Sequence, residues 1–423
     1  MATFTTFGAL AGLALAIVLV LRKIQPSYAL VAGALVGGIL GGGGLVSTVG
    51  AMVSGAQGMM PTVLRILVSG VLVGALVGTG SATRLARAIT DAIGPRMALG
   101  AIALATLLTA ASGVFIDIAI ITLAPLALAV GRVAGLHIPA ILLAMVGGGK
   151  AGNIISPNPN TIAVSEAFGF DVVKVMAANI VPAMVSLAVT VLLASWIERR
   201  CAAGKWMSTS TGSEQVDDAA GGPPLAAAIS GPATTILLLS LGNFFGLKID
   251  PMVALPAGGL VCIVACGHAR RTIDHLNLGF SKVAGVSILL VGTGTIAGII
   301  RASGLNADLI SLLSACHLPI AALAPLSSVL LSGATGSTVA GVTLASQTFA
   351  TTLVEAGVPS LWAAAALHAG GTIFDALPHG SFFHATAGSV GMSVRERLRI
   401  FPYGTLVGLT STVVSSLMYI FYL

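Results

Sequence analysis

A polar stretch at residues 147–161 separates two apolar runs, each long enough to cross a membrane, and constrains the fold most strongly. It contains three consecutive glycines at 147–149 together with Pro157 and Pro159. Glycine lowers helix propensity and proline removes a backbone donor, so neither run is expected to continue through the stretch as a helix. Inside a bilayer, unpaired backbone groups are tolerated only against protein or a water-filled cavity. A helix broken there is a candidate site for an ion or a substrate.

The rest of the chain has the composition of a protein that crosses the membrane several times. Of its 423 residues 56% are hydrophobic and 8% are charged, whereas a soluble domain carries roughly a quarter charged residues. The 53 glycines fit the same class, because small residues let transmembrane helices approach closely. Arg22 and Lys23 follow the first apolar run, which is the reverse of a secretory signal. We therefore expect a first spanning helix whose amino end lies outside.

The second half of the chain repeats short motifs of the first half in the same order. The tetrapeptide Val-Gly-Thr-Gly at 77–80 recurs at 291–294, and Ser-Gly at 112–113 recurs at 332–333. Further on, Pro182 corresponds to Pro402. The offset between matching motifs stays between 214 and 222 residues. The shared order and the near-constant offset indicate an internal repeat.

We predict an all-α polytopic membrane protein with two repeats, at residues 1–197 and 225–423, joined by a polar cytoplasmic linker at 198–224. Each repeat is predicted to contain five transmembrane helices, one re-entrant hairpin and one broken helix. The hairpins are expected at 97–131 and 319–352, and the broken helices at 138–166 and 360–386.

The predicted topology is inverted, because five spans are an odd number and the second repeat must then be upside down relative to the first. With the amino end outside, fifteen of the 20 Lys and Arg residues fall in inside loops and four in outside loops, which obeys the positive-inside rule. Arg397 is assigned to an inside loop, and Lys150 remains within the membrane. Both chain ends are expected outside. Residues 47–61 are predicted to form a surface segment separate from a span at 62–79.

Polar residues at the two breaks and the two hairpin tips are the candidate substrate ligands. The amino ends of half-helices direct backbone N–H groups and partial positive charge at their target, which suits an anion such as a carboxylate. Amide and hydroxyl groups suit a polyhydroxylated ligand; in the alternative, they only cap the freed backbone of the break. The candidates are Ser112, Lys150, Asn153, Ser156, Asn158, Asn160, Thr161, Thr335, Ser337, Thr338, Thr372 and Ser381.

Ionisable residues within apolar segments are the candidate ion-coupling residues. A charge in hydrocarbon costs at least about 2.5 kcal/mol and usually marks a pathway or a proton site, the alternative being a structural Lys–Asp pair that braces the bundle. Histidine titrates near neutral pH and can carry a proton, or it can stay neutral against backbone carbonyls. The four cysteines are expected to be packing residues, and no metal or cofactor site is expected. The ion-coupling candidates are Asp117, His368, Asp375, His379 and His384.

Three short motifs resemble the gluconate:proton symporter (GntP) family of the ion transporter superfamily. Ser-Pro-Asn-Pro at 156–159 resembles that family's Pro-His-Pro-Gly-type turn. Residues 333–340 resemble its second hairpin tip, and residues 382–394 its carboxy-terminal stretch. The resemblance implies proton-coupled uptake of a small organic or sugar acid by a homodimer in the bacterial cytoplasmic (inner) membrane, with an elevator-type motion.

The sequence thus favours a secondary active transporter for a small, gluconate-like carboxylate, coupled to H⁺ or Na⁺, with Lys150 as the candidate carboxylate anchor. One alternative is a Na⁺/H⁺-type cation antiporter of the same architecture, in which the carboxylates form the whole site and Lys150 is a structural counter-ion. A membrane-embedded enzyme is disfavoured, because the sequence contains no HExxH or GxSxG signature. The net charge of +6 does not indicate a nucleic-acid partner, since it arises in the loops.

Overall fold

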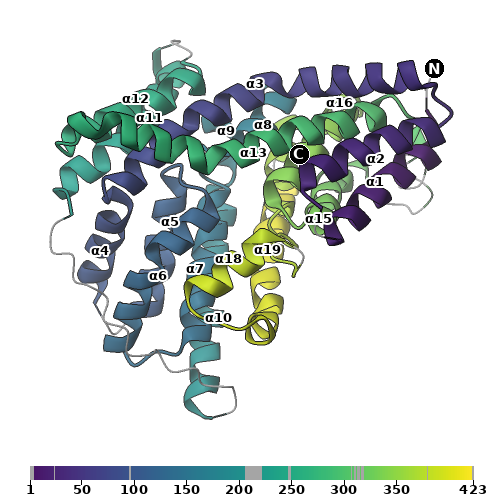
Figure 1. The fold of residues 1–423 in the computed structure, drawn as a ribbon. Helices are drawn as coiled ribbons and strands as arrows, with labels where there is room; N and C mark the ends of the chain where they lie inside the picture. The colour runs from purple at the N-terminus through teal and green to yellow at the C-terminus, as the bar shows by residue number, and fades with distance from the viewer. Residues whose placement is uncertain are drawn as a thin grey trace.

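The computed structural model describes residues 4–22, 24–94, 97–204, 222–245, 249–305, 307–308, 311, 315, 319–378 and 380–421 (Figure 1). Their regular structure is helical, without a β-strand, and one isolated bridge joins Phe4 and Ser303. The predicted all-α class is therefore confirmed for the described part. Four helices there are long and apolar enough to cross a membrane, or five if α6 (Ile116–Val133), which is bent by 49°, counts as one span.

The two longest helices, α3 (Leu45–Gly78) and α13 (Thr272–Arg301), pack against each other and run side by side through the molecule (Figure 1). Gly70 of α3 lies directly against Gly279 of α13, with no room for a Cβ atom on either residue. Such contacts between small residues let two helix backbones approach closely. We call this pair of helices the spine.

The first half of α3 differs from the sequence prediction, which placed a separate surface segment at 47–61. The helix continues through Pro61 without interruption. Met52 and Met59 are buried, and Gly55 packs against Gly298 of α13. The segment is therefore part of the packed spine, and its apolar contacts with α13 explain why a proline did not end the helix.

Two helical pairs flank the spine. The first pair is α1 (Thr6–Leu21) with α2 (Pro26–Leu40), and α2 packs against α13. The second pair is α11 (Leu225–Phe245) with α12 (Pro251–Ala265), and α12 packs against α3. Figure 1 shows the two pairs toward opposite ends of the spine. Each pair thus packs on the spine helix from the other half of the chain.

After the spine helix, the first half continues with a hairpin, a broken helix and a final helix. Gly113 forms the hairpin tip with φ +107°, a backbone conformation that residues with a side chain rarely adopt. The helices are α4 (Ser81–Ile93), α5 (Ala98–Ala111), α6, α7 (Ile138–Asn153), α8 (Pro159–Phe168), α9 (Val172–Ala178) and α10 (Ile180–Ala202).

The second half continues in the same order, and its hairpin tip also contains a glycine of positive φ, Gly336 at +62°. The helices are η2 (Ala269–Arg271) before α13, then η3 (Ile320–Ala322), α15 (Leu323–Thr335), α16 (Thr338–Glu355), α17 (Ser360–Gly370), α18 (Ser381–Ser389) and α19 (Val394–Phe421).

The two halves exchange contacts through their broken helices. The α8 helix packs against α16 and α17 of the second half, and α18 packs against α6 of the first half. The final helices α10 and α19 also pack against each other, and α19 contacts α7. These contacts bring the two breaks, residues 154–158 and 371–380, into one region of the molecule.

The three glycines at 147–149 are helical, although the sequence analysis included them in the break. Gly147 packs against Thr190 of α10, and Gly148 packs against the backbone of Ala103 in α5. The run therefore serves the close packing of α7 between its neighbours. The interruption itself is confined to residues 154–158, which include Pro157.

Candidate functional site

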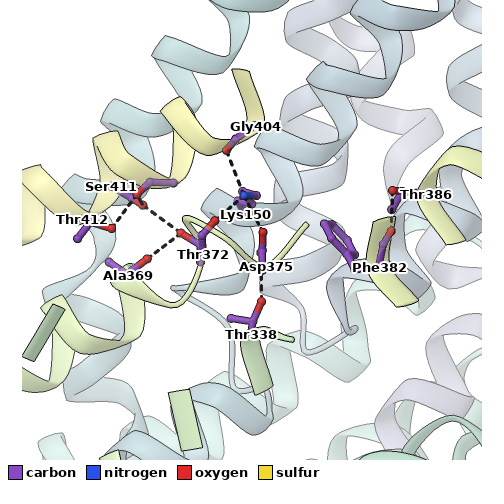
Figure 2. A network of polar contacts seen from close by, with 11 residues as sticks. Lys150, Thr338, Ala369, Thr372, Asp375, Phe382, Thr386, Gly404, Ser411 and Thr412 are labelled. Atoms are coloured by element: carbon purple, nitrogen blue, oxygen red, sulfur yellow. Dashed lines mark hydrogen bonds and ion pairs between the residues drawn. The ribbon is translucent and has the colours of Figure 1, made fainter. Parts of the chain in front are cut away.

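A buried ion pair joins the two broken helices. Nζ of Lys150, in the last turn of α7, lies 2.8 Å from Oδ1 of Asp375 in the second break, and each side chain is 2% exposed (Figure 2). Neither charge is accessible to solvent, so each depends on its partner for compensation. The pair unites one residue predicted for substrate binding with one predicted for ion coupling.

Further contacts extend this ion pair to two more helices. Lys150 also donates to the backbone carbonyls of Thr372 and, at 3.1 Å, Gly404 of α19. Asp375 accepts a hydrogen bond of 3.1 Å from the hydroxyl of Thr338, the first residue of α16 after the hairpin tip. Figure 2 shows this continuous network. It connects α7, the second break, the second hairpin and α19.

Asn158 caps the helix that follows the first break. Its Oδ1 accepts from the backbone N–H groups of Asn160 at 2.9 Å and Thr161 at 3.2 Å. Its Nδ2 donates to both oxygens of Asn153, each at 2.7 Å. The Thr161 hydroxyl donates to the Ser156 carbonyl at 2.5 Å. For Asn158 and Thr161 these contacts match the capping role that the sequence analysis considered as the alternative to ligand binding.

Three buried polar atoms of the same break have no hydrogen-bond partner among the described residues. They are Nδ2 of Asn153, Oγ of Ser156 and Oδ1 of Asn160. All three residues are at most 3% exposed. Buried polar groups are almost always satisfied, and an unsatisfied one costs about 1–3 kcal/mol. This concentration of free donors and acceptors in one turn marks it as a place for a polar ligand.

The hairpin tips touch the breaks, but three of their predicted site residues bind their own helices. Gly113 lies against Pro157 and Gly336 against Gly380, so each tip meets the break of its own half. The hydroxyl of Ser112 donates to Thr109 O at 2.7 Å, that of Thr335 donates to Leu331 O at 2.8 Å, and that of Ser337 accepts from Ala340 N–H at 3.3 Å.

The remaining ion-coupling candidates have different surroundings. His368 of α17 is fully buried, and neither ring nitrogen has a hydrogen-bond partner among the described residues. Asp117, in the first turn of α6, is half-buried and accepts from Ile118 N–H at 2.9 Å. His384 is exposed and hydrogen-bonds the Pro378 carbonyl at 2.7 Å. His379 and the Ser381 side chain lie outside the described residues.

Arg397 is a buried charged residue that the sequence analysis did not include among the candidates, because it was assigned to an inside loop. It lies in the first turn of α19, is 0% exposed, and its three guanidinium nitrogens have no hydrogen-bond partner within the described part of the chain. Its Cζ lies 5.5 Å from the ring centroid of Phe383. One sequence signal was available: Arg395 and Arg399 are four residues apart and share an exposed helix face, which turns Arg397 inward.

A separate polar cluster lies near the carboxyl end of α8. Arg65 of α3 pairs with Glu166 and, at 2.7 Å, with Asp250 in the loop before α12. An adjacent cavity of about 210 Å³ is lined in part by these three residues and Asp171. The hydrogen bonds from Arg65 lower the pKa of Asp250 below its usual value of 3.8. This cluster ties the first broken helix to the spine.

Comparison with known proteins identifies the family of this chain. Residues 4–422 match the family model described as GntP family permease. The chain belongs to the GntP family of permeases. It is also 46% identical over 419 residues to an uncharacterized transporter from Haemophilus influenzae, with 99% of each chain covered. The permease is thus a multi-pass membrane protein of a family of transporters, which confirms the family predicted from the sequence.

A solved structure shares the fold of this permease. The crystal structure of the Alcanivorax borkumensis YdaH transporter, described as revealing an unusual topology, has a TM-score of 0.65 to this chain at 18% sequence identity. The likeness covers 90% of this chain and 89% of that one. At this identity the comparison shows the fold alone. Among the described residues, no group of three or more His, Cys, Asp or Glu side chains that could hold a metal ion occurs.

Proposed function

We propose that this permease is a proton-coupled symporter for a small hydroxylated organic acid of the gluconate type. The observation that carries the proposal is the group of unpartnered polar atoms on Asn153, Ser156 and Asn160, next to the Lys150–Asp375 pair. Asn153 follows Lys150 by three residues at the end of α7, so both side chains lie on the same helix face. The break thus joins neutral hydrogen-bonding groups to a charged network.

The unpartnered atoms supply the chemistry that a hydroxylated ligand requires. The Asn153 amide nitrogen donates, the Asn160 amide oxygen accepts, and the Ser156 hydroxyl does both. A sugar acid presents hydroxyl groups that can satisfy all three atoms at once. Binding such a ligand removes the penalty of the unsatisfied groups, whereas an analogue without hydroxyls leaves the penalty in place.

Coupling to protons rests on His368 and Asp117. The imidazole of His368 is fully buried and has no hydrogen-bond partner among the residues that the structure describes. The protonation of such a group can change with the arrangement of the helices around it. The Na⁺/H⁺ antiporter alternative is less well supported. Asp375, its main candidate ligand, is already paired with Lys150 and hydrogen-bonded by Thr338, which leaves little coordination for a cation.

The arrangement of helices supports alternating access between a fixed and a moving part. The spine and its flanking pairs would form the fixed part, and the hairpins and broken helices the moving part of an elevator. The shared order of hairpin, broken helix and final helix in the two halves, and the packing of α8 on α16 and of α18 on α6, support an inverted repeat. A homodimer in the bacterial inner membrane, with both termini outside, belongs to the same proposal.

Uptake into liposomes tests the function. Purified permease is reconstituted, and entry of labelled gluconate is measured with an inward proton gradient, an inward Na⁺ gradient or neither. Accumulation driven by the proton gradient, and competed by other hydroxylated monocarboxylates, is the expected result. Sodium-driven proton movement without uptake of any organic acid would instead identify the antiporter.

A further inference from the structure

Arg397 carries a buried charge that forms no ion pair or hydrogen bond with any described residue. The side chain is 0% exposed, and its Nε, Nη1 and Nη2 atoms all lack a hydrogen-bond partner among the described residues. It lies within electrostatic range of Lys150 and Asp375. Among the described residues, two cations and one carboxylate therefore share this region, which leaves one positive charge uncompensated. An unpaired charge in a dry interior is strongly unfavourable.

Lys150, the other cation, is already paired within the protein. Its Nζ donates to the carbonyls of Thr372 and Gly404 and forms an ion pair with Asp375 Oδ1 at 2.8 Å. An ammonium group has three N–H donors, so little of its binding capacity remains for a ligand. Asp375 compensates the charge of Lys150, and the contacts with α19 and the second break fix the position of the ammonium group. The sequence-based hypothesis that Lys150 anchors the carboxylate is therefore less well supported than a role in bracing the two broken helices.

The guanidinium group of Arg397 matches a carboxylate in shape as well as in charge. It presents five N–H donors in a planar fork, which can bind the two oxygens of a carboxylate together. The ring of Phe383, 5.5 Å from Cζ, restricts the orientation of this fork by a cation–π contact. Phe383 is itself fully buried, so the group is held in a defined place.

We infer that Arg397 binds the carboxylate of the transported acid and that Lys150 and Asp375 form a structural pair beside it. This inference rests on the proposed function, because it assumes an organic anion as substrate. It also limits the substrate to one carboxylate: the region offers one uncompensated positive charge, so a second carboxylate would be buried without a partner. A small inorganic anion such as chloride could compensate the same charge and is the competing occupant.

Two substitutions at this position, with a control on the same helix, test the inference. Arg397→Gln removes the charge, Arg397→Lys keeps the charge but loses the fork, and Arg399→Gln changes an exposed residue two positions away. The dissociation constants of gluconate and chloride, and the melting temperature without ligand, are measured for each purified protein. We expect gluconate affinity to fall about 100-fold in Arg397→Gln, less in Arg397→Lys, and not in Arg399→Gln.

The melting temperature without ligand distinguishes a ligand-binding role of Arg397 from a structural role, because the two roles predict shifts in opposite directions. Without ligand, Arg397→Gln should melt at a higher temperature than wild type, since an unpaired buried charge is gone. A lower melting temperature with unchanged gluconate affinity would overturn the inference alone. Loss of chloride binding with gluconate binding intact would overturn it too, in favour of the inorganic anion. Wild-type permease that binds no carboxylate would overturn the proposed function together with it.

Discussion

Nζ of Lys150 and Oδ1 of Asp375 lie 2.8 Å apart in the interior, although 225 residues separate them in the chain and each belongs to a different broken helix. The pair is the electrostatic link between the two halves at the place where both helices are interrupted. Its Thr338 hydrogen bond adds the second hairpin tip to the link. A change in this pair is therefore expected to affect all three elements at once.

The two single substitutions that break the Lys150–Asp375 pair should lower the stability of the protein by different amounts. Asp375→Asn leaves Lys150 and Arg397 as two buried cations without a carboxylate, whereas Lys150→Met leaves Asp375 beside Arg397. Breaking a buried pair from one side costs about 3–5 kcal/mol, and Asp375→Asn should lie at the upper end. Melting temperatures in detergent measure the order. Equal losses, or a larger loss in Lys150→Met, would contradict this account of the charges.

His368 is predicted to carry the coupled proton. His368→Asn should keep exchange of labelled gluconate across the liposome membrane but lose the accumulation that an inward proton gradient drives. The matched control is His268→Asn, since His268 belongs to neither break and stacks on His275 near the start of α13, with ring centroids 5.2 Å apart. Proton-driven accumulation that survives in His368→Asn would exclude this histidine as the coupling group.

The sequence predicted the interruptions of the helices because their signals are local. Pro157, Pro159 and the Ser-Gly pair at 112–113 act through the backbone of their own residues. Accordingly, α7 ends at Asn153, α8 begins at Pro159, and α5 ends at Ala111. The same reasoning went too far at Pro61 and at the glycines of α7. There the neighbouring helices supply contacts that outweigh the local propensity.

The charged part of the site could be predicted only as a set of candidates. Lys150 and Asp375 stood out as charges within apolar segments, and a structural Lys–Asp pair was one of the alternatives, but the sequence could not decide between Asp117 and Asp375 as the partner of Lys150. Arg397 belongs to a cluster of arginines that is typical of an inside loop. Its burial results from the packing of α19 against α7, a contact between distant parts of the chain. The spacing of Arg395 and Arg399 indicates that Arg397 faces inward, but it does not identify the helix that Arg397 packs against.

The spine should be sensitive to a single methyl group. In Gly279→Ala the new Cβ would overlap the backbone of Gly70, so the two helices must separate and the melting temperature should fall sharply. Gly285→Ala is the matched control on the same helix, because nothing lies within 4 Å of a Cβ there. It should be neutral, or stabilising by about 0.5–1 kcal/mol through helix propensity. Similar behaviour of the two variants would refute the close packing.

The contribution of the Arg65–Asp250 contact to stability should decrease as the pH falls. Because Arg65 lowers the pKa of Asp250 below 3.8, the contact stabilises the fold above about pH 4 and is lost as the pH falls through the lowered pKa. Asp250→Asn keeps a residue suited to cap α12 but removes the charge. The melting temperature of wild type should exceed that of this variant at pH 7, by the small amount typical of a partly exposed pair. The difference should begin to shrink at about pH 3.8 and vanish below the lowered pKa of Asp250.

Ser156 and Thr161 allow ligand binding to be separated from stability within one turn. The Ser156 hydroxyl has no hydrogen-bond partner in the described part of the chain, so Ser156→Ala should leave the melting temperature unchanged or slightly higher. The Thr161 hydroxyl donates to the Ser156 carbonyl at 2.5 Å, so Thr161→Val should destabilise by about 1–3 kcal/mol by leaving that carbonyl unsatisfied.

Affinity should show the opposite order from stability. Ser156→Ala is expected to weaken gluconate binding about tenfold, because one ligand hydroxyl then loses its partner, while binding of a carboxylate without hydroxyls such as propionate stays the same. Equilibrium binding of both ligands to each purified variant measures this. If Ser156→Ala lowers the melting temperature and leaves gluconate binding intact, the Ser156 hydroxyl stabilises the fold and does not bind the ligand. The proposal of a hydroxylated substrate then loses its main support.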